Sequence, residues 1–483
     1  MLGVLAHPAW AASARTPAEV GVPRPNILFI LVDDQRNDTL GCAGHPIIQT
    51  PNIDRLARQG VRFENTFVTT SICMASRATI FTGLTQRTNG YRPSDPQGSV
   101  DITDADLMTS FPTVLKQAGY HTGFFGKNHV NYERGNEPAF NAMFHQWEHI
   151  HLNPYFKEMP DGTKRHCGEI IGDKSVAFLE SRPKDKPFML YMSFNISHAE
   201  DGDHRPGIGH FPWPKSVDGL YEDIVPLRPR LDDPAIFNAL PEFLKSSLNR
   251  TRYYWRWDTP EKYDTNMRAL YRMLTGMDRI VGRVLQTLEK EGVADNTVVI
   301  YIADNGYYMG DRGFAGKWSH FEQSMRVPLI ICDPRLPENQ RGRVVDPMVL
   351  NLDMPSTILD LAGLPVPDKY QGRSLVQILE SQTPADWRTS FFCEHHQYAN
   401  IIPAWAGIRG ERYVYARYDR LEPAYEFLHD LKHDPDQLIN FAGDPEYTAV
   451  LKQFRQQTGN EIQKHTRPAT IAKQRASLEK ESR

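Results

Sequence analysis

The sequence predicts an α/β fold with a large, mainly parallel or mixed sheet and helices on both of its faces. Residues 25–34 (PNILFILVDD) and 187–194 (PFMLYMSF) are apolar runs typical of strands buried on both sides. Amphipathic segments alternate with such runs along the chain, and this alternation is typical of a parallel sheet. We therefore expect crossover helices between successive strands.

The elements follow in order. Residues 50–68 have an Asn/Asp start and a 3.6-residue apolar pattern, which predicts a helix ending at Gly60 and then a strand. Residues 111–127 repeat the order helix, glycine, strand. Residues 271–306 predict a long helix leading into a strand that ends in Ala-Asp-Asn. Residues 200–265 are rich in Pro, Trp and Tyr, which favours a long ordered excursion over the surface.

The chain divides into four predicted segments. Residues 1–23 form a possible signal or leader, with a short apolar stretch and a small-x-small site at Ala12-Ser13-Ala14. Residues 24–375 form the main α/β domain, and 376–465 form a smaller α+β subdomain with an antiparallel sheet. Residues 466–483 form a charged tail.

Composition excludes several classes of partner. The 483 residues carry a formal charge of −4, which gives no reason to expect a nucleic acid. No run approaches the ~18 apolar residues of a membrane span. Five scattered cysteines are too few for a disulfide scaffold. We expect a periplasmic or secreted protein, and a cytoplasmic location is the alternative.

Acidic residues follow two predicted strands. Asp33 and Asp34 end the run 25–34, and Asp304 and Asn305 end the strand near 297–305. Neighbouring side chains on a strand point to opposite faces, so each pair can serve one centre only where its strand ends and curls. Open α/β sheets bind ligands at these ends. Carboxylate and amide oxygens favour Ca²⁺ or Mg²⁺ over Zn²⁺. Ordinary turn residues are the alternative for either pair alone.

Cys73 lies in SICMASRATIFTG (71–83), which contains no second cysteine. This segment resembles the signature of the type I sulfatases, members of the alkaline-phosphatase-like superfamily. Their motif reads Cys-x-Pro-Ser-Arg or its Ala variant, and its cysteine is oxidised to formylglycine. Further family motifs occur in the same order from residue 24 to about 440: RPNILFILVDDQ, TPNIDRLARQGVRFENTFV, GKNH, GKWSHFEQSMRVPLII, DMPSTILDLAGLP and QGRSL.

The resemblance implies a sulfuric ester hydrolase whose nucleophile is a hydrated aldehyde derived from Cys73. One hydroxyl of the hydrate attacks sulfur, and loss of the proton of the other then expels sulfate and restores the aldehyde. A cysteine thiolate lacks that second step. A formylglycine-generating or equivalent maturation enzyme is therefore an implied partner, and a sulfated small molecule or glycan is the implied substrate.

The resemblance also implies a role for each matching residue. Asp33, Asp34, Asp304 and Asn305, with the modified Cys73, would hold Ca²⁺, with Mg²⁺ as the alternative. Arg77 would lie one helical turn after Cys73 and hold the hydrate and a metal-ligand carboxylate. Lys127 and Lys317 would neutralise the sulfate, and His129 would hydrogen-bond the hydrate.

One further histidine belongs near the leaving group, after the strand 187–194. The family often has Pro-His there, and this chain has Ser197-His198. Counting from Pro187 favours His198, and His204 is the alternative. Two other positions depart from the common pattern: Ala75 replaces a proline, and Asn305-Gly306 replaces a histidine-containing pair.

The predicted substrate is a sulfated sugar. Aromatic residues of the excursion either stack on sugar faces or fill a core beneath it: Trp213, Tyr221, Tyr253, Tyr254, Trp255 and Trp257. A loop of the C-terminal subdomain would reach the rim of the pocket, where His395, His396 and Arg409 would contact substrate. The alternatives are a phosphomonoester, phosphodiester or phosphonate hydrolase on the same scaffold, and a glycan-binding homologue with an unmodified Cys73.

Overall fold

A large mixed sheet forms the centre of the computed structural model, which describes residues 24–93, 99–202, 205, 209–398 and 401–466. Its eight strands have the order β13-β2-β12-β9-β1-β8-β4-β5. Only β12 runs antiparallel to its neighbours β2 and β9. The strands are β1 (Asn26–Val32), β2 (Val61–Phe63), β4 (His121–Gly126), β5 (Gln146–His149), β8 (Phe188–Ser193), β9 (Thr297–Ala303), β12 (Leu329–Cys332) and β13 (Arg343–Val345).

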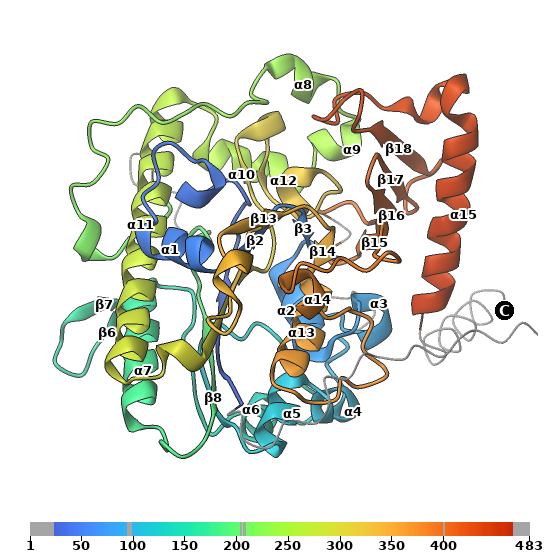
Figure 1. Ribbon diagram of the computed structural model, residues 1–483. Coiled ribbons are helices and arrows are strands. Elements are labelled where there is room, and N and C mark those ends of the chain that lie inside the picture. Colours follow the sequence, from blue (N-terminus) through green and yellow to red (C-terminus); the bar gives the residue numbers. More distant parts are fainter. Residues whose placement is uncertain (1–23, 94–98, 203–204, 206–208, 399–400, 467–483) are drawn as a thin grey trace, which may run out of the picture.

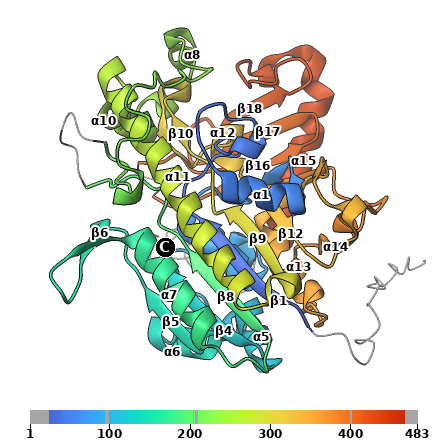
Figure 2. The same ribbon diagram turned by 60° about the vertical axis from the view of Figure 1, so that its left-hand side comes forward.

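Helices cover both faces of this sheet, as the sequence predicts (Figures 1 and 2). One face carries α1 (Pro51–Gln59), α7 (Cys167–Ser181) and α11 (Pro260–Lys290). The other carries α2 (Cys73–Thr82), α5 (Phe111–Gln117), α6 (Asn136–Met143) and α13 (Met354–Leu361). The central strands β1, β8 and β9 are completely buried, which explains their continuous apolar sequences.

A four-stranded antiparallel sheet follows near the C-terminus, on the right in Figure 1. It consists of β15 (Ser390–His395), β16 (Trp405–Gly410), β17 (Tyr413–Tyr418) and β18 (Tyr425–Asp430), and α15 (Thr448–His465) packs on it. One apolar cluster contains Phe67 and Phe314 from the main unit together with Trp405 from β16. The two parts therefore share a core, and the boundary between 375 and 376 stays a prediction.

The excursion contains more helix than the sequence analysis expects. It includes α8 (Pro234–Asn238), α9 (Glu242–Lys245) and α10 (Leu248–Arg256). The long helix α11 begins at Pro260 rather than near residue 271. Thr259 caps it by accepting a hydrogen bond from the amide of Lys262, and proline is favoured at the first helical position. The pair Thr259-Pro260 was the sequence signal that could have placed the start of this helix.

Segments 1–23 and 467–483 lie outside the described residues, so the predicted leader and most of the tail are not described. Among the described residues, no helix combines the length and the apolar character needed to cross a lipid bilayer.

Gly126 ends β4 immediately before Lys127 and provides a test of how tightly this strand end is packed. Its φ is +126°, and a Cβ there would lie 1.9 Å from the carbonyl oxygen of Ser193. Gly119 has a φ of +93° but open space around it. We expect Gly126→Ala to lower the free energy of unfolding by about 3 kcal/mol or more, and Gly119→Ala by about 1 kcal/mol. Urea denaturation measures both, and equal losses would contradict this packing.

Candidate active site

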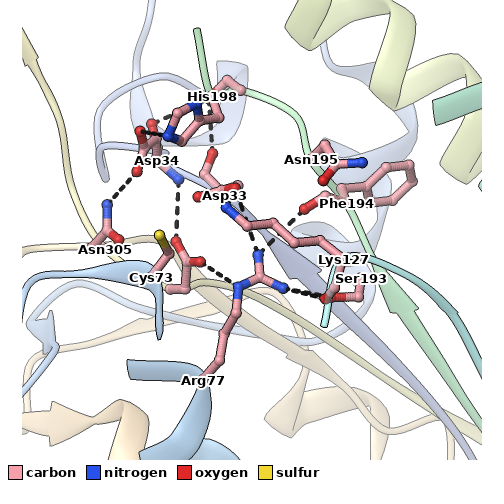
Figure 3. Close-up of polar contacts among 12 residues, drawn as sticks. Asp33, Asp34, Cys73, Arg77, Lys127, Ser193, Phe194, Asn195, His198 and Asn305 are labelled. Atoms are coloured by element: carbon pink, nitrogen blue, oxygen red, sulfur yellow. Dashed lines mark hydrogen bonds and ion pairs between the residues drawn. The ribbon is translucent and has the colours of Figure 1, made fainter. Parts of the chain in front are cut away.

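The chain turns sharply at the carboxyl ends of β1 and β9, where the acidic residues lie. Asp34 adopts a left-handed conformation, with φ of +54°, which aspartate tolerates better than most residues. The amide of Asp34 donates to Oδ1 of Asp304 at 3.2 Å. Carboxylate oxygens of Asp33, Asp34 and Asp304 lie within 4.8 Å of one another. The structure thus brings neighbouring residues of one strand end to a single centre (Figure 3).

These oxygens fit a hard divalent cation. Oδ1 of Asp33, Oδ2 of Asp34 and Oδ1 of Asn305 are buried and have no hydrogen-bond partner among the described residues. The amide nitrogen of Asn305 donates to Asp34 at 2.7 Å and to the carbonyl of Gly306 at 2.9 Å, which leaves its oxygen free. Burial and the charge of Asp33 raise the pKa of Asp304 to about 8. A cation among these oxygens opposes that shift because it favours the ionised carboxylates.

Arg77 joins the acidic centre to the helix that begins at Cys73. Its guanidinium is buried, and Nε donates to Oδ2 of Asp304 at 2.7 Å. Nη1 donates to the carbonyl of Lys127 at 2.9 Å and to the hydroxyl of Ser193 at 2.6 Å. Burial alone would lower the pKa of Arg77, but the carboxylates of Asp304 and Asp33 raise it. Arg77 therefore carries a permanent charge that fixes four strand and helix ends.

Two lysines complete the positive side of the site. Lys127 follows β4 and its ammonium bonds Asp33, whereas Lys317 follows β11 (Ala315–Gly316) and bonds Asp34. Burial would lower the pKa of each lysine, but the adjacent aspartates raise both. Nζ of Lys317 lies 3.8 Å from Sγ of Cys73. Both lysines therefore remain cationic beside the side chain of Cys73.

The structure places His198 in this site. Nδ1 of His198 lies 2.6 Å from the carbonyl of Ala199, so this nitrogen must donate. Nε2 lies 3.6 Å from Oδ2 of Asp34 and carries a proton only when the ring is cationic. His204, the alternative, lies outside the described residues. His129 is exposed on the wall of the same cavity and has a φ of +57°.

A cavity of about 560 Å³ opens above Cys73. Its inner wall contains the predicted residues Cys73, Lys127, His129, His198 and Lys317. Sequence reasoning missed several residues of its outer wall, including Asp201, Arg252, Trp318, Tyr398 and Ile402. None of the six aromatic residues named in the sequence analysis lines this cavity in the described part of the chain; Tyr221 and Trp257 pack in the main core instead.

The loop after β15 does reach the cavity, but through Tyr398, Ile401 and Ile402 rather than through the predicted residues. His395 is buried and bonds the carbonyl of Gln397 at 3.0 Å. His396 lines a separate cavity with Arg87 and Glu394. Arg409 lines a third cavity, where it donates to Glu322 at 3.1 Å. The correction follows from strand geometry, because alternate side chains of β15 and β16 point to opposite faces.

The loop that carries Lys317 is anchored to the C-terminal sheet. Nε1 of Trp405 donates to the carbonyl of Trp318 at 2.8 Å. Two residues later, Nδ1 and Nε2 of His320 lie 2.9 Å from the hydroxyl of Tyr418 and 3.1 Å from Nε2 of His429. Nδ1 of His429 lies 2.8 Å from the carbonyl of Ile439.

The carbonyl of Ile439 ends this series of hydrogen bonds and determines which ring nitrogen of each histidine carries the proton. Nδ1 of His429 must donate to Ile439, so its Nε2 accepts from Nε2 of His320, and Nδ1 of His320 accepts from Tyr418. In this arrangement a further proton on Nε2 of His429 would face the N–H of His320. Burial lowers the pKa of His429 to about 3 and also lowers the pKa of His320. The anchor is therefore intact at neutral pH.

Known proteins match this chain over most of its length. The family model for sulfatases matches residues 25–364, and a model for the C-terminal region of N-sulphoglucosamine sulphohydrolase matches 310–464. N-acetylglucosamine-6-O-sulfatase from Bacteroides thetaiotaomicron is 30% identical over 499 aligned residues, which cover 92% of this chain and 87% of that relative.

Solved structures share the architecture. A protein solved in complex with its substrate, D-glucosamine-2-N,6-O-disulfate, has a TM-score of 0.74 and 27% identity, covering 92% of this chain and 98% of that one. The phosphonate monoester hydrolase of Agrobacterium radiobacter has a TM-score of 0.72 at 23% identity, covering 92% and 96%, which shows a common fold.

The hydrogen-bonded series from Tyr418 through His320 and His429 to Ile439 predicts that the free energy of unfolding depends on pH. In the unfolded chain His429 takes up a proton below its ordinary pKa of about 6.5, whereas the native ring stays neutral down to about pH 3. Stability is therefore lost as pH falls through this window, by about 2 kcal/mol between pH 6.5 and 5. Urea denaturation should show a flatter pH dependence for His429→Gln, whose amide can still donate and accept. His151→Gln, at an exposed position, is the control. Identical slopes for wild type and His429→Gln would refute the assignment.

Proposed function

The chain belongs to the sulfatase family and is therefore a sulfuric ester hydrolase, and we propose that it removes a 6-O-sulfate from glucosamine units of a sulfated glycan. The observation that carries this proposal is the 30% identity, over 92% of the chain, to N-acetylglucosamine-6-O-sulfatase. The match of residues 310–464 to the C-terminal region of N-sulphoglucosamine sulphohydrolase supports the same sugar.

The proposed nucleophile is formylglycine derived from Cys73. Cys73 is the first residue of α2, is buried, and has no disulfide partner among the described residues. The hydrated aldehyde supplies a hydroxyl nucleophile at this position. Ala75 is the family's variant of the motif, so we propose a maturation enzyme that accepts it.

The proposed roles of the surrounding residues follow from their charges. Lys127 and Lys317 bind sulfate oxygens and stabilise the negative charge that grows during attack. Arg77 positions Asp304 and the start of α2. His198 protonates the leaving oxygen through Nε2 in its cationic form, and His129 orients the hydrate from the cavity wall.

The proposed cation is Ca²⁺, held by Asp33, Asp34, Asp304 and Asn305. It would polarise a sulfate oxygen and favour ionisation of the nucleophile. The unpaired oxygens of these residues support an oxygen-only site with several ligands, which suits Ca²⁺.

We also propose export to the periplasm or the exterior. The support is the short apolar stretch of residues 1–23 and its small-x-small site.

The nucleophile can be tested by mass spectrometry of the tryptic peptide that contains Cys73, from protein made in its native host. We expect the mass of an aldehyde in place of the thiol, and Cys73→Ala should lower kcat for an aryl sulfate by about 1,000-fold or more. Aryl phosphate is the comparison substrate. An unmodified thiol throughout would refute the mechanism, and a higher kcat/KM for phosphate would refute sulfate as the preferred ester.

Metal removal tests the cation site. Chelation should lower aryl sulfate turnover by about 100-fold or more, because the cation stabilises charge in the transition state. Ca²⁺ added back should restore activity and raise the melting temperature, since it binds only the native protein. Asp34→Asn should lose both responses. Full activity after exhaustive dialysis against chelator would contradict a cation requirement.

A further inference from the structure

A second group of charges lies on the outer wall of the Cys73 cavity. Arg252, on α10 (upper left in Figure 2), has a side chain only 14% exposed and forms an ion pair with Asp201 at 2.6 Å. Arg256, one turn later, is fully buried and bonds the other oxygen of the same carboxylate. Two guanidinium groups therefore share one carboxylate, which leaves one positive charge in excess in this group.

Trp318 packs against the guanidinium of Arg252. The central carbon of that guanidinium lies 4.9 Å from the centre of the indole ring. Trp318 has a φ of +81°, an outlier for so large a residue, and Trp405 holds its carbonyl at 2.8 Å. Among the described residues, Nε of Arg252 and Nε1 of Trp318 have no hydrogen-bond partner. Arg252 and Trp318 both line the cavity, and their side chains carry only N–H donors, which match a ligand group that accepts hydrogen bonds.

The excess charge is not needed by the reacting sulfate. The inner site balances its own charges, because three buried carboxylates face three buried cations, and a divalent cation would add two positive charges beside Cys73. Those six residues are Asp33, Asp34, Asp304, Arg77, Lys127 and Lys317. Arg252 is therefore available to a different part of the substrate.

We propose that Arg252, supported by Trp318, binds a second anionic group of the substrate, a sulfate or a carboxylate beside the 6-O-sulfate. This inference rests on the proposed function and narrows its substrate to multiply charged glycans. Arginine suits the role because its planar fork pairs with the oxygens of either anion. Asp201 acts as a positioning residue, since it holds Arg252 at the wall and links it to Arg256.

The test compares two substrates that differ in the second group. Wild type, Arg252→Gln and Arg250→Gln are assayed with D-glucosamine-2-N,6-O-disulfate and with N-acetylglucosamine-6-O-sulfate. Arg250 lies on the same helix, donates to the carbonyl of Gly313 and does not line the cavity. In Arg252→Gln the pair between Asp201 and Arg256 remains.

We expect Arg252→Gln to lower the ratio of kcat/KM between disulfate and monosulfate by about 10- to 100-fold, and Arg250→Gln to leave that ratio unchanged. An unchanged ratio in Arg252→Gln would overturn the inference while the proposed function stands. Aryl sulfate turnover by a wild type that hydrolyses neither glucosamine substrate would overturn the proposed substrate and this inference together.

Inhibition of aryl sulfate hydrolysis shows whether the second group is a sulfate or a carboxylate. Glucosamine N-sulfate and glucuronate, which lack the 6-O-sulfate, are tested as competitive inhibitors of aryl sulfate hydrolysis. If the second group is a sulfate, glucosamine N-sulfate inhibits wild type and loses potency in Arg252→Gln. If it is a carboxylate, glucuronate shows that behaviour. Equal inhibition of wild type and Arg252→Gln by both compounds would overturn the inference.

Discussion

The site depends on the buried ion pair between Arg77 and Asp304. Through it one guanidinium connects α2, which begins at Cys73, to the ends of β4, β8 and β9. Removal of one partner from a buried pair costs about 3–5 kcal/mol, because the other charge is left without compensation. The arrangement therefore tolerates neither a shift of α2 nor a different order of the central strands. The position of the nucleophile is set by the same contacts that stabilise the sheet.

Charge compensation also explains why the site spans most of the chain. Three carboxylates without cations would be too costly to bury, and the compensating side chains come from separate crossover units. Lys127 follows β4, whereas Lys317 arrives on a loop that depends on the C-terminal sheet through Trp405 and His320. The small sheet therefore contributes to the site even though it supplies no charge to it. Its role is to hold the loop that carries Lys317 in place beside Cys73.

Much of this could be predicted from sequence because strand-end residues follow a simple geometric rule. Asp33, Asp34, Asp304 and Asn305 come directly after buried apolar runs, and parallel strands bring such positions to one edge. The turn of the helix places Arg77 beside them. The expectation for His395 and Arg409 came from the resemblance instead, and neither residue lines the Cys73 cavity, because the direction of each side chain depends on the register and facing of β15 and β16. Aromatic content alone could not tell whether the excursion fills a core or contacts a ligand.

The outer wall illustrates what local sequence cannot show. Arg252 and Trp318 are 66 positions apart and meet only because α10 packs on β11, the strand that precedes Lys317. Arg252 lies in none of the family motifs, and Trp318 lies in GKWSHFEQSMRVPLII without a role that the motif assigns to it. Their meaning comes from the balance of charges around them. With its three carboxylates ionised, the inner site is neutral before a divalent cation binds, so a further cation on the wall changes which ligand the cavity favours. Substrate preference in this fold can therefore change through the excursion while the strand ends, and with them the chemistry, stay constant.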